Sequence, residues 1–366
     1  MSDGINYKQG ILNRGNNFRI KNVIARASRK EKVTIAFLGG SITRGFAATS
    51  PQLCYAGRTF SWWQKKFPET EFDYINAGIG ATDSEYGAAR LDEHVLRYDP
   101  DLVFVEYSVN DENTEHYKET YESLIRKIYF SKKKPAVILL HNVYYESGKS
   151  AQDIHVEIAK HYDLPSLSVK ETIYRAMQEG KFVMAEIAED GLHPTDKGHE
   201  YVAGLLCAYL EWVMGEQVDA EVEEKPQPVT FSSYENALIC GTDYTYVKTK
   251  GFIALQDKTT DITEWEKNGF WAARNGDEIE FTVPGINVAV QYRKSAKRSA
   301  PIAEAFIDGE RHILDANFEE DWGDKLELQT ILKHGEYKNH HVVIRIIDEG
   351  VGETDIFFLK AVIGFH

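Results

Sequence analysis

A serine on a glycine-rich turn is the first residue of this chain whose setting could support chemistry. In the stretch VTIAFLGGSITRG an apolar run, residues 33–38, ends at Gly39 and Gly40, and Ser41 follows. Ligand sites of open parallel sheets lie beyond the carboxyl ends of the strands, so Ser41 would be accessible there. A following helix would direct its free N–H groups at an anion. Ser41 is a candidate nucleophile, although a serine that only caps a helix fits this stretch equally well.

The segment DGLHPTDKGH, residues 190–199, contains the two groups that would activate such a serine. A hydroxyl becomes a useful nucleophile when a base removes its proton and a third group orients that base. Asp190 and His193 are three residues apart in a turn, so the carboxylate could hold one imidazole nitrogen while the other faces outward. Two alternatives are a capping turn with an incidental histidine and a metal site of Asp190, His193 and His199. The metal site lacks the HExxH pattern.

Two further turns could stabilise the oxyanion that attack on a carbonyl generates. NAGIGATDS (76–84) and EYSVNDEN (106–113) each end a β-like run. The expected donors are the backbone N–H of Ser41, the backbone N–H of Gly80 or Ala81, and the side-chain amide of Asn110. His141, at the end of AVILLHNV (136–143), is a weaker candidate for contact with the substrate, because a histidine at a strand end is usually structural.

Strands and helices alternate through the first 215 residues and would position these side chains. The apolar runs are continuous, which is typical of parallel strands covered on both faces. Strands are predicted at 33–39, 72–78, 101–108 and 136–143. Helices are predicted at 60–67, 84–98 and 117–130, and after Thr195, a plausible N-cap. This alternation predicts a doubly wound α/β domain over residues 1–215.

A different pattern begins after an acidic, proline-containing stretch at 216–229, which we interpret as a linker. Residues 230–366 alternate or run β-branched, with Asp308-Gly309 as a tight turn, and predict an all-β sandwich, a jelly roll in our interpretation. This region contains Trp265, Trp271 and Trp322, and aromatic faces can stack on sugar rings. Trp322 is the candidate substrate contact, although core packing is the commoner role of a tryptophan.

Composition narrows the class of partner. The 366 residues carry a net charge of −15 with only short basic clusters, which argues against nucleic acid. No apolar run is long enough to span a membrane, and the N-terminus has no signal-peptide pattern. The three cysteines lie far apart and suggest reduced thiols. We therefore expect a cytoplasmic protein with no nucleic-acid or membrane partner; its oligomeric state stays open.

The four blocks GGSIT, NAGIGAT, SVND and DGLH together resemble the SGNH hydrolases, the GDSL-type esterases, over about residues 15–214. The resemblance implies a flavodoxin-like three-layer fold. It implies Ser41 as nucleophile, Asp190 and His193 as the rest of the triad, and Gly80 and Asn110 in the oxyanion hole. In three places the chain departs from the family pattern, one of them being that Ala81 could stand at the donor position of the second block in place of Gly80. Gly40 stands in place of the family's aspartate, and Ser108 stands in place of the usual glycine.

The order of an SGNH-like region followed by a β region resembles two-domain carbohydrate acetylesterases that act on mannan oligosaccharides. This resemblance implies removal of O-acetyl groups from acetylated plant oligosaccharides by a Ser-His-Asp acyl-enzyme mechanism, with a carbohydrate-binding-like second domain. No metal or organic cofactor is expected. The alternatives are a different SGNH esterase or thioesterase, acting on xylooligosaccharides or lipid esters, and a non-catalytic binding protein.

Overall fold

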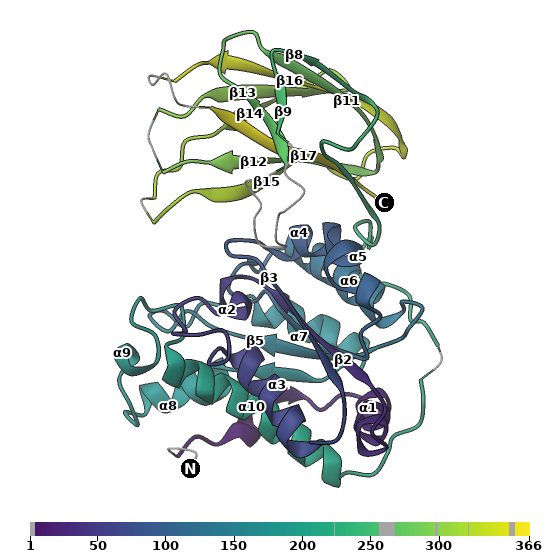
Figure 1. Cartoon of the computed structure of the whole chain (residues 1–366), viewed down its shortest axis with the longest axis vertical. Coiled ribbons are helices and arrows are strands. Elements are labelled where there is room, and N and C mark those ends of the chain that lie inside the picture. Colours follow the sequence, from purple (N-terminus) through teal and green to yellow (C-terminus); the bar gives the residue numbers. More distant parts are fainter. Residues whose placement is uncertain (1–3, 223, 256–267, 297–298, 321, 351–355) are drawn as a thin grey trace. The chain divides into compact units, whose positions relative to one another are not determined.

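The computed structural model describes residues 4–222, 224–255, 268–296, 299–320, 322–350 and 356–366. The chain divides into two compact units, Met1–Ser232 and Ser233–His366. The first is an α/β unit and the second is formed by β-strands (Figure 1).

The sheet of the first unit has the strand order β1-β6-β5-β4-β2-β3. Its strands are β1 (Ile11–Asn13), β2 (Val33–Gly39), β3 (Phe72–Gly78), β4 (Leu102–Glu106), β5 (Ala136–His141) and β6 (Ser166–Ser168). Neighbouring strands are parallel, except that β1 pairs antiparallel with β6. Apart from β1, the order is that of flavodoxin-like folds, which confirms the predicted fold class.

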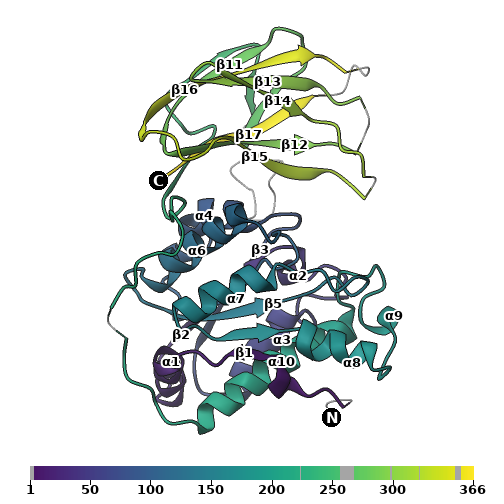
Figure 2. The ribbon, with the colours of Figure 1, turned by 180° about the vertical axis from the view of Figure 1, so that it is seen from behind.

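Helices cover both faces of this sheet (Figures 1 and 2). One layer contains α1 (Phe18–Ser28), α3 (Tyr55–Lys66) and α10 (Asp196–Gly215), and the other contains α4 (Ser84–Ala89), α6 (Glu115–Tyr129) and α7 (Gln152–His161). Shorter helical segments are η1 (Tyr7–Gly10), α2 (Ser41–Arg44), α5 (Leu91–His94), η2 (Leu96–Tyr98), η3 (Lys170–Tyr174), α8 (Arg175–Gln178) and α9 (Met184–Ile187). Because both faces are covered, every residue of β2 is buried, which explains its continuous apolar sequence.

The helix predicted over 84–98 is interrupted in the structure. Helix α4 ends at Ala89, and the short segments α5 and η2 follow. Arg90, between α4 and α5, is only 1% exposed and donates hydrogen bonds to backbone carbonyls at the ends of two strands. These contacts turn the chain inward at Arg90. The other predicted helices are present; Thr195 caps α10, its Oγ accepting the N–H of Gly198 at 3.3 Å.

In the described residues of the second unit the strands form two antiparallel sheets, ordered β15-β12-β17-β10-β9, with β7 beside β17, and β14-β13-β16-β11-β8. The strands are β7 (Ala237–Cys240), β8 (Val247–Lys250), β9 (Ile253–Leu255), β10 (Gly269–Ala272), β11 (Glu278–Gly285), β12 (Asn287–Lys294), β13 (Ile302–Ile307), β14 (Glu310–Asp315), β15 (Lys325–Leu332), β16 (Lys338–Asp348) and β17 (Phe357–Phe365). Strand β11 alternates strictly between buried and half-buried residues, and its buried side chains join one core with those of β12, β16 and β17. An all-β second unit is thus confirmed.

The stretch 216–229, predicted as a linker, is hydrogen-bonded to the first unit. Asp219 pairs with Arg14 at 2.9 Å. Near the other end, the buried carboxylate of Glu122 accepts the backbone N–H groups of Val229 and Thr230, each at 2.8 Å. The described residues of this stretch contain no helix or strand. It is therefore an irregular segment held to the α/β unit.

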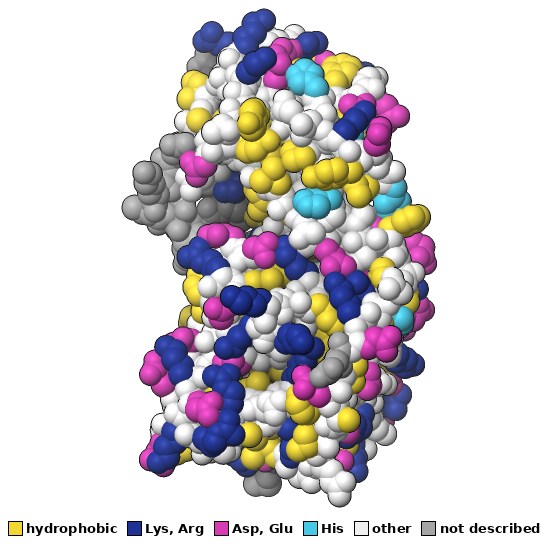
Figure 3. Space-filling view, turned by 90° about the vertical axis from the view of Figure 1, so that its right-hand side faces the viewer, with side chains coloured by type: hydrophobic (Ala, Val, Ile, Leu, Met, Phe, Trp, Pro, Cys, Tyr) yellow, Lys and Arg dark blue, Asp and Glu magenta, His cyan; other side chains and the backbone are white. Residues whose placement is uncertain are grey.

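Charged side chains of both signs are interspersed over the face of the α/β unit displayed in Figure 3. Across the described parts of the chain, no helix is long and apolar enough to cross a membrane.

Candidate active site

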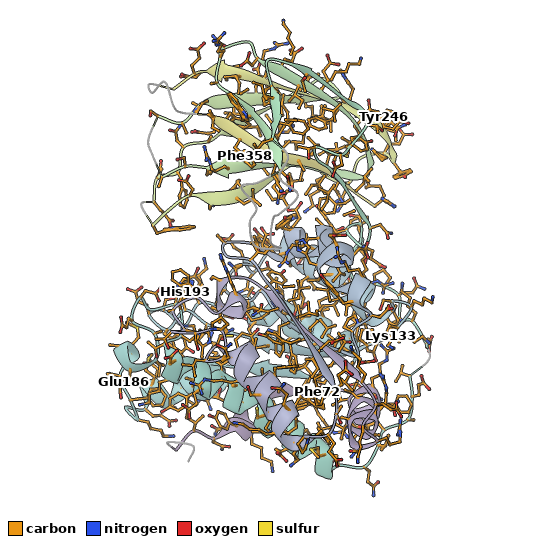
Figure 4. The ribbon with its side chains drawn as sticks, in the orientation of Figure 1. Phe72, Lys133, Glu186, His193, Tyr246 and Phe358 are labelled. Atoms are coloured by element: carbon orange, nitrogen blue, oxygen red, sulfur yellow. The ribbon has the colours of Figure 1, made fainter. Side chains whose placement is uncertain are left out.

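Three turns that follow three adjacent strands bring the predicted groups to one edge of the sheet. Ser41 begins α2 directly after β2, Gly80 lies in the turn after β3, and Asn110 follows β4. Strand β2 lies between β3 and β4, so the turn that contains Ser41 is flanked by the other two. This is the point at which the strand order reverses, where ligands of doubly wound sheets bind. His193 lies at this end of the sheet, and Phe72, where β3 begins, marks the opposite end (Figure 4).

The glycines before Ser41 are required by close packing. A Cβ at Gly39 would lie 2.2 Å from Thr43 Oγ1 and 2.5 Å from the carbonyl oxygen of Glu106. A Cβ at Gly40 would lie 2.4 Å from Oδ1 of Asn110. Gly40 therefore lets the Asn110 side chain pack against the backbone immediately before Ser41.

Two consecutive hydrogen bonds connect Ser41 to His193 and His193 to Asp190. Ser41 Oγ lies 2.8 Å from His193 Nε2, and His193 Nδ1 lies 2.6 Å from Asp190 Oδ2. A carboxylate can only accept, so Nδ1 carries the proton and Nε2 presents its lone pair to the Ser41 hydroxyl. This arrangement can remove a proton from Ser41 and is the geometry of a nucleophile, a base and an orienting acid.

The Asp190 carboxylate also builds its own turn. Oδ1 accepts the backbone N–H groups of Leu192 at 2.9 Å and His193 at 2.7 Å. Gly191 takes a positive φ of 77°, and its carbonyl accepts the N–H of Tyr145 at 2.7 Å. Partial burial acts to raise the pKa of Asp190, but the hydrogen bonds from His193 and from the two backbone groups outweigh it and lower the pKa. Asp190 is therefore ionised at neutral pH and stabilises a protonated His193.

Donors for an oxyanion lie next to Ser41. A Cβ at Gly80 would lie 3.8 Å from Ser41 Cβ, so this backbone passes beside the serine. Ser41 and Gly80 donate their backbone N–H groups to no other group in the described chain, and the Asn110 side-chain amide likewise makes no hydrogen bond there. Gly80 and Asn110 thus lie near Ser41, and their role as oxyanion donors, like the choice between Gly80 and Ala81, stays a prediction.

Phe46 is a site residue that the sequence reasoning missed. Its ring lies 4.4 Å from the imidazole of His193, centroid to centroid, and the side chain is 57% exposed. The backbone of Phe46 is held from both sides, because its N–H donates to the Ser41 carbonyl at 3.0 Å and its carbonyl accepts Nε2–H of His199 at 3.2 Å. No sequence pattern distinguishes Phe46 from other aromatic residues; only its position five residues after Ser41 could have drawn attention to it.

A cavity of about 410 Å³ lies beside His193. It is lined by Ala47, Thr49, Glu189, Asp190, His193, Thr195, Asp196 and Lys197. Asp196 accepts hydrogen bonds from the backbone N–H of Thr49 at 2.8 Å and from its hydroxyl at 2.6 Å, so the first turn of α10 holds the loop after α2 in place. All of these residues except Ala47 have polar or charged side chains, so the cavity offers hydrogen-bonding groups to a hydroxyl-rich ligand.

The metal interpretation is not supported. His199 is buried, and both of its ring nitrogens bind backbone groups: Nδ1 accepts the N–H of Tyr55 at 3.2 Å and Nε2 donates to Phe46. Burial lowers the pKa of His199 to about 4, so the ring is neutral. No group of three or more His, Cys, Asp or Glu side chains in the described ranges could hold a metal ion.

The predicted substrate contact at His141 is corrected by the structure. Its side chain is 0% exposed, and Nε2 lies 2.7 Å from the Ser166 hydroxyl. Strand β5 lies one position beyond β4 from the reversal point, and the His155 ring of α7 lies 5.7 Å from the His141 ring, centroid to centroid. Burial lowers the pKa of His141 well below its ordinary value, so this is a neutral core histidine.

Of the tryptophans in the second unit, Trp322 is 56% exposed, and its indole N–H donates to the Glu320 carboxylate. Its contact with substrate stays a prediction. Trp271 lies in β10 and is half-buried. Trp265 lies outside the described residues.

Comparison with known proteins identifies the family of the chain. Residues 37–201 match the model of the GDSL-like lipase/acylhydrolase family. A crystal structure of a two-domain esterase active on acetylated mannans is 46% identical to this chain, covering 99% of this chain and 98% of the other, with a TM-score of 0.96. The chain belongs to the GDSL-like lipase/acylhydrolase family.

Two other relatives of this GDSL-type hydrolase are informative. A crystal structure of a two-domain esterase active on acetylated mannans, co-crystallised with mannopentaose, is 46% identical and has a TM-score of 0.95 over 99% of this chain and 98% of the other. Thioesterase 1/protease 1/lysophospholipase L1 of Escherichia coli is 22% identical over 185 residues, 49% of this chain and 83% of that protein. Both units therefore have counterparts in the first relative, whereas the second covers half of this chain.

Proposed function

We propose that this GDSL-type hydrolase is a serine esterase that removes O-acetyl groups from acetylated plant oligosaccharides, with mannooligosaccharides as the preferred substrate class. The observation that carries the proposal is the hydrogen-bonded line from Ser41 through His193 to Asp190, with unengaged donors beside the serine. The likeness over both units to esterases active on acetylated mannans supports the choice of substrate.

The first half-reaction is acyl transfer to the enzyme. Ser41 Oγ attacks the acetyl carbonyl carbon while His193 Nε2 takes its proton, and the π electrons of the carbonyl move onto oxygen. The N–H groups of Ser41 and Gly80 and the amide of Asn110 stabilise that oxyanion. When the oxyanion collapses, the ester C–O bond breaks and the His193 proton passes to the departing sugar oxygen. The products are acetyl-Ser41 and a free sugar hydroxyl.

The second half-reaction releases acetate. Neutral His193 takes a proton from water, whose oxygen attacks the acetyl carbon through the same oxyanion. The C–O bond to Ser41 then breaks, and His193 returns the proton to the serine. Asp190 keeps Nδ1–H oriented in both steps and stabilises the imidazolium, because its lowered pKa keeps it charged.

The position of the leaving sugar follows from this chemistry. Its oxygen must come within hydrogen-bonding distance of His193 Nε2 to receive the proton. The Phe46 ring lies beside the His193 ring, tilted by 52° from it, and is largely exposed, and exposed aromatic rings of this kind pack against sugar rings. The cavity beside His193 is lined by carboxylate, hydroxyl and amine side chains that can bind the sugar hydroxyls. We therefore place the deacetylated sugar against Phe46. A carbohydrate-binding role for the second unit, with Trp322 as a contact, and a cytoplasmic location are parts of the same proposal.

The test is acetate release from defined oligosaccharides, followed by mass spectrometry. Acetylated mannooligosaccharides, acetylated xylooligosaccharides and acyl thioesters are offered separately to the wild type, to Ser41→Ala, and to Ser28→Ala, a serine at the end of α1 that serves as the matched control. We expect loss of one acetyl mass at a time from the mannan substrate by the wild type and the control, and none by Ser41→Ala. Turnover of thioesters alone would refute the carbohydrate proposal. Equal activity of Ser41→Ala would refute the mechanism.

A further inference from the structure

Arg90 is a buried cation below the site to which the proposed mechanism gives no part. Its guanidinium donates to the carbonyl of Ala77 at 2.7 Å, to the carbonyl of Gly39 at 3.1 Å and to the hydroxyl of Tyr107 at 2.9 Å. In the described chain no Asp or Glu forms an ion pair with Arg90. Taking a guanidinium out of water is costly, and the hydrogen bonds to these neutral acceptors must compensate for that cost. Because the donor is charged, these hydrogen bonds are stronger than those between neutral groups.

These three acceptors belong to three neighbouring strand ends, whereas a further contact, of Arg90 Nη1 with His94 Nδ1 at 3.3 Å, stays within the segment of α4 and α5. Gly39 is the last residue of β2, Ala77 is the residue before the last of β3, and Tyr107 directly follows β4. Each lies two or three residues before one of the proposed oxyanion donors. A single rigid, planar group therefore links the backbones of β2 and β3 directly, and β4 through the Tyr107 side chain, just before the turns from which the donors extend.

Asp111 joins two of the same turns. It directly follows Asn110, and its side chain has no exposed surface. Oδ1 accepts the backbone N–H of Ser84 at 2.9 Å, and Ser84 begins α4, where the turn that contains Gly80 ends. The carboxylate therefore holds the turn of Gly80 against the turn of Asn110.

The second oxygen of Asp111 is anchored on helix α7. Oδ2 lies 3.0 Å from Nε2 of His155, whose ring stacks on Tyr121 with centroids 3.5 Å apart. Burial lowers the pKa of His155 to about 3, so the ring is neutral and donates Nε2–H. The N-terminus of the helix is fixed to the same region, because Ala151 N–H donates to the carbonyl of Ser108 at 2.7 Å.

We propose that Arg90 and Asp111 are positioning residues that hold the three oxyanion donors at the separation that the tetrahedral oxyanion requires. The proposal rests on the proposed function and adds a role for two residues that touch neither substrate nor Ser41. Oxyanion donors must lie about 2.7–3.1 Å from the developing charge, and a misplacement of about 1 Å can cost about 10²-fold in rate. Loss of either residue should therefore lower kcat and leave KM almost unchanged.

The decisive experiment is a double-mutant cycle with Asn110 on 4-nitrophenyl acetate and on an acetylated mannooligosaccharide. We expect Asp111→Ala and Arg90→Met each to lower kcat about 10²-fold with KM within about threefold, and Asn110→Ala to lower kcat about 10²–10³-fold. If the two residues act through the donors, adding Asp111→Ala or Arg90→Met to Asn110→Ala costs less than about a further tenfold. If they only stabilise the fold, the losses multiply.

A conservative variant and matched controls separate positioning from stability. In Asp111→Asn, Oδ1 can still accept a hydrogen bond from the Ser84 N–H. The new NH₂ group can donate a hydrogen bond to Nε2 of His155 if the ring proton moves to Nδ1, an atom that has no partner in the described chain. We expect this variant to keep kcat within about threefold, a rescue a positioning hydrogen bond allows. The controls are Arg126→Met and Glu122→Ala, a buried arginine and a buried carboxylate whose hydrogen bonds include those to residues 226–230 and to Tyr162.

The controls should lower the melting temperature and leave kcat unchanged below it. If Arg90→Met does not fold, the two Asp111 variants carry the test. Multiplicative losses in the cycle, or equal losses in Asp111→Asn and Asp111→Ala, would overturn the proposal while Ser41→Ala stays inactive. Failure of the proposed function is a separate result, in which Ser41→Ala retains activity.

Discussion

Replacing Asp190 by asparagine tests how His193 is oriented. The asparagine Oδ1 can still accept the two backbone N–H groups that the carboxylate now accepts, so the turn from 190 to 193 survives. Its NH₂ group would face Nδ1 of His193, which is now bound to Oδ2 at 2.6 Å. The imidazole then gains a hydrogen bond only by placing its proton on Nε2. In that tautomer Nε2 donates towards Ser41 and cannot remove the serine proton.

The size of the loss depends on the exposure of the carboxylate. In buried triads the same change lowers kcat about 10⁴-fold. Here the Asp190 side chain is 49% exposed, so water can take its place as the acceptor of Nδ1–H and restore part of the productive tautomer. Solvent also weakens the stabilisation that the carboxylate gives to the imidazolium. We therefore expect kcat/KM to fall about 10²–10³-fold, equivalent to about 3–4 kcal/mol.

The assay is initial-rate hydrolysis of 4-nitrophenyl acetate between pH 6 and 9, with Asp190→Ala for comparison. Asp190→Ala removes the hydrogen bonds of the turn, but it lets water accept the hydrogen bond from Nδ1–H of His193. If the turn stays folded without its hydrogen bonds, Asp190→Ala should be at least as active as Asp190→Asn. A circular dichroism melt of each variant monitors the fold. Activity of Asp190→Asn within threefold of wild type would refute the tautomer reasoning.

Three further predictions follow from single contacts. Phe46→Ala should raise KM for acetylated mannooligosaccharides about tenfold and leave kcat/KM for ethyl acetate within about threefold, because only the sugar packs on the Phe46 ring. Steady-state assays of both esters measure this, and equal effects on the two would contradict the prediction. Gly40→Ala should lower kcat about 10–10²-fold at nearly constant KM, since its Cβ would displace the Asn110 amide; unchanged kcat would contradict the contact. Burial raises the pKa of Glu106 from 4.5 to about 7, so between these pH values only the unfolded chain ionises and the native state loses stability as pH rises. Glu106→Gln removes this loss, so the melting temperature of the variant minus that of wild type should be larger at pH 7.5 than at pH 5. An equal difference at the two pH values would count against this prediction.

The sequence was most informative where burial imposes a simple pattern. Strand β2 matches its predicted range because both faces of the sheet are covered there, so apolar residues run without interruption. Strand β3 also matches its predicted range, although it is an edge strand and its first five residues are half-buried. In the second unit, β11 alternates because one face meets the core and the other does not. Thr195 was recognised as a cap because its hydroxyl has a fixed local partner. These signals are local, and so they survive in a single sequence.

The remaining features depend on contacts between distant segments. The break after Ala89 follows from Arg90, whose acceptors lie 13, 17 and 51 residues away. The contact of Phe46 with His193 joins two loops that no pattern connects. His141 was predicted near the substrate because strand ends share an edge, but at the end of β5 the histidine is fully buried, with the His155 ring of α7 beside it. The hydrophobic periodicity of a sequence carries no information about contacts between segments that are distant along the chain.

The order of the strands in the sheet decides which residues meet. Along the chain the turns come in the order Ser41, Gly80, Asn110, but in the sheet β2 lies between β3 and β4. Neighbouring strands are about 4.8 Å apart, so this order puts each donor turn one strand away from the serine. Had the sheet followed chain order, the turn of Asn110 would lie two strands, about 10 Å, from Ser41, and its amide could not reach an oxyanion formed there. The reversal of strand order after β3 therefore brings Asn110 within reach of the Ser41 hydroxyl. The hydrogen-bonded turn at Asp190 does the same for His193, which is also distant from Ser41 in sequence.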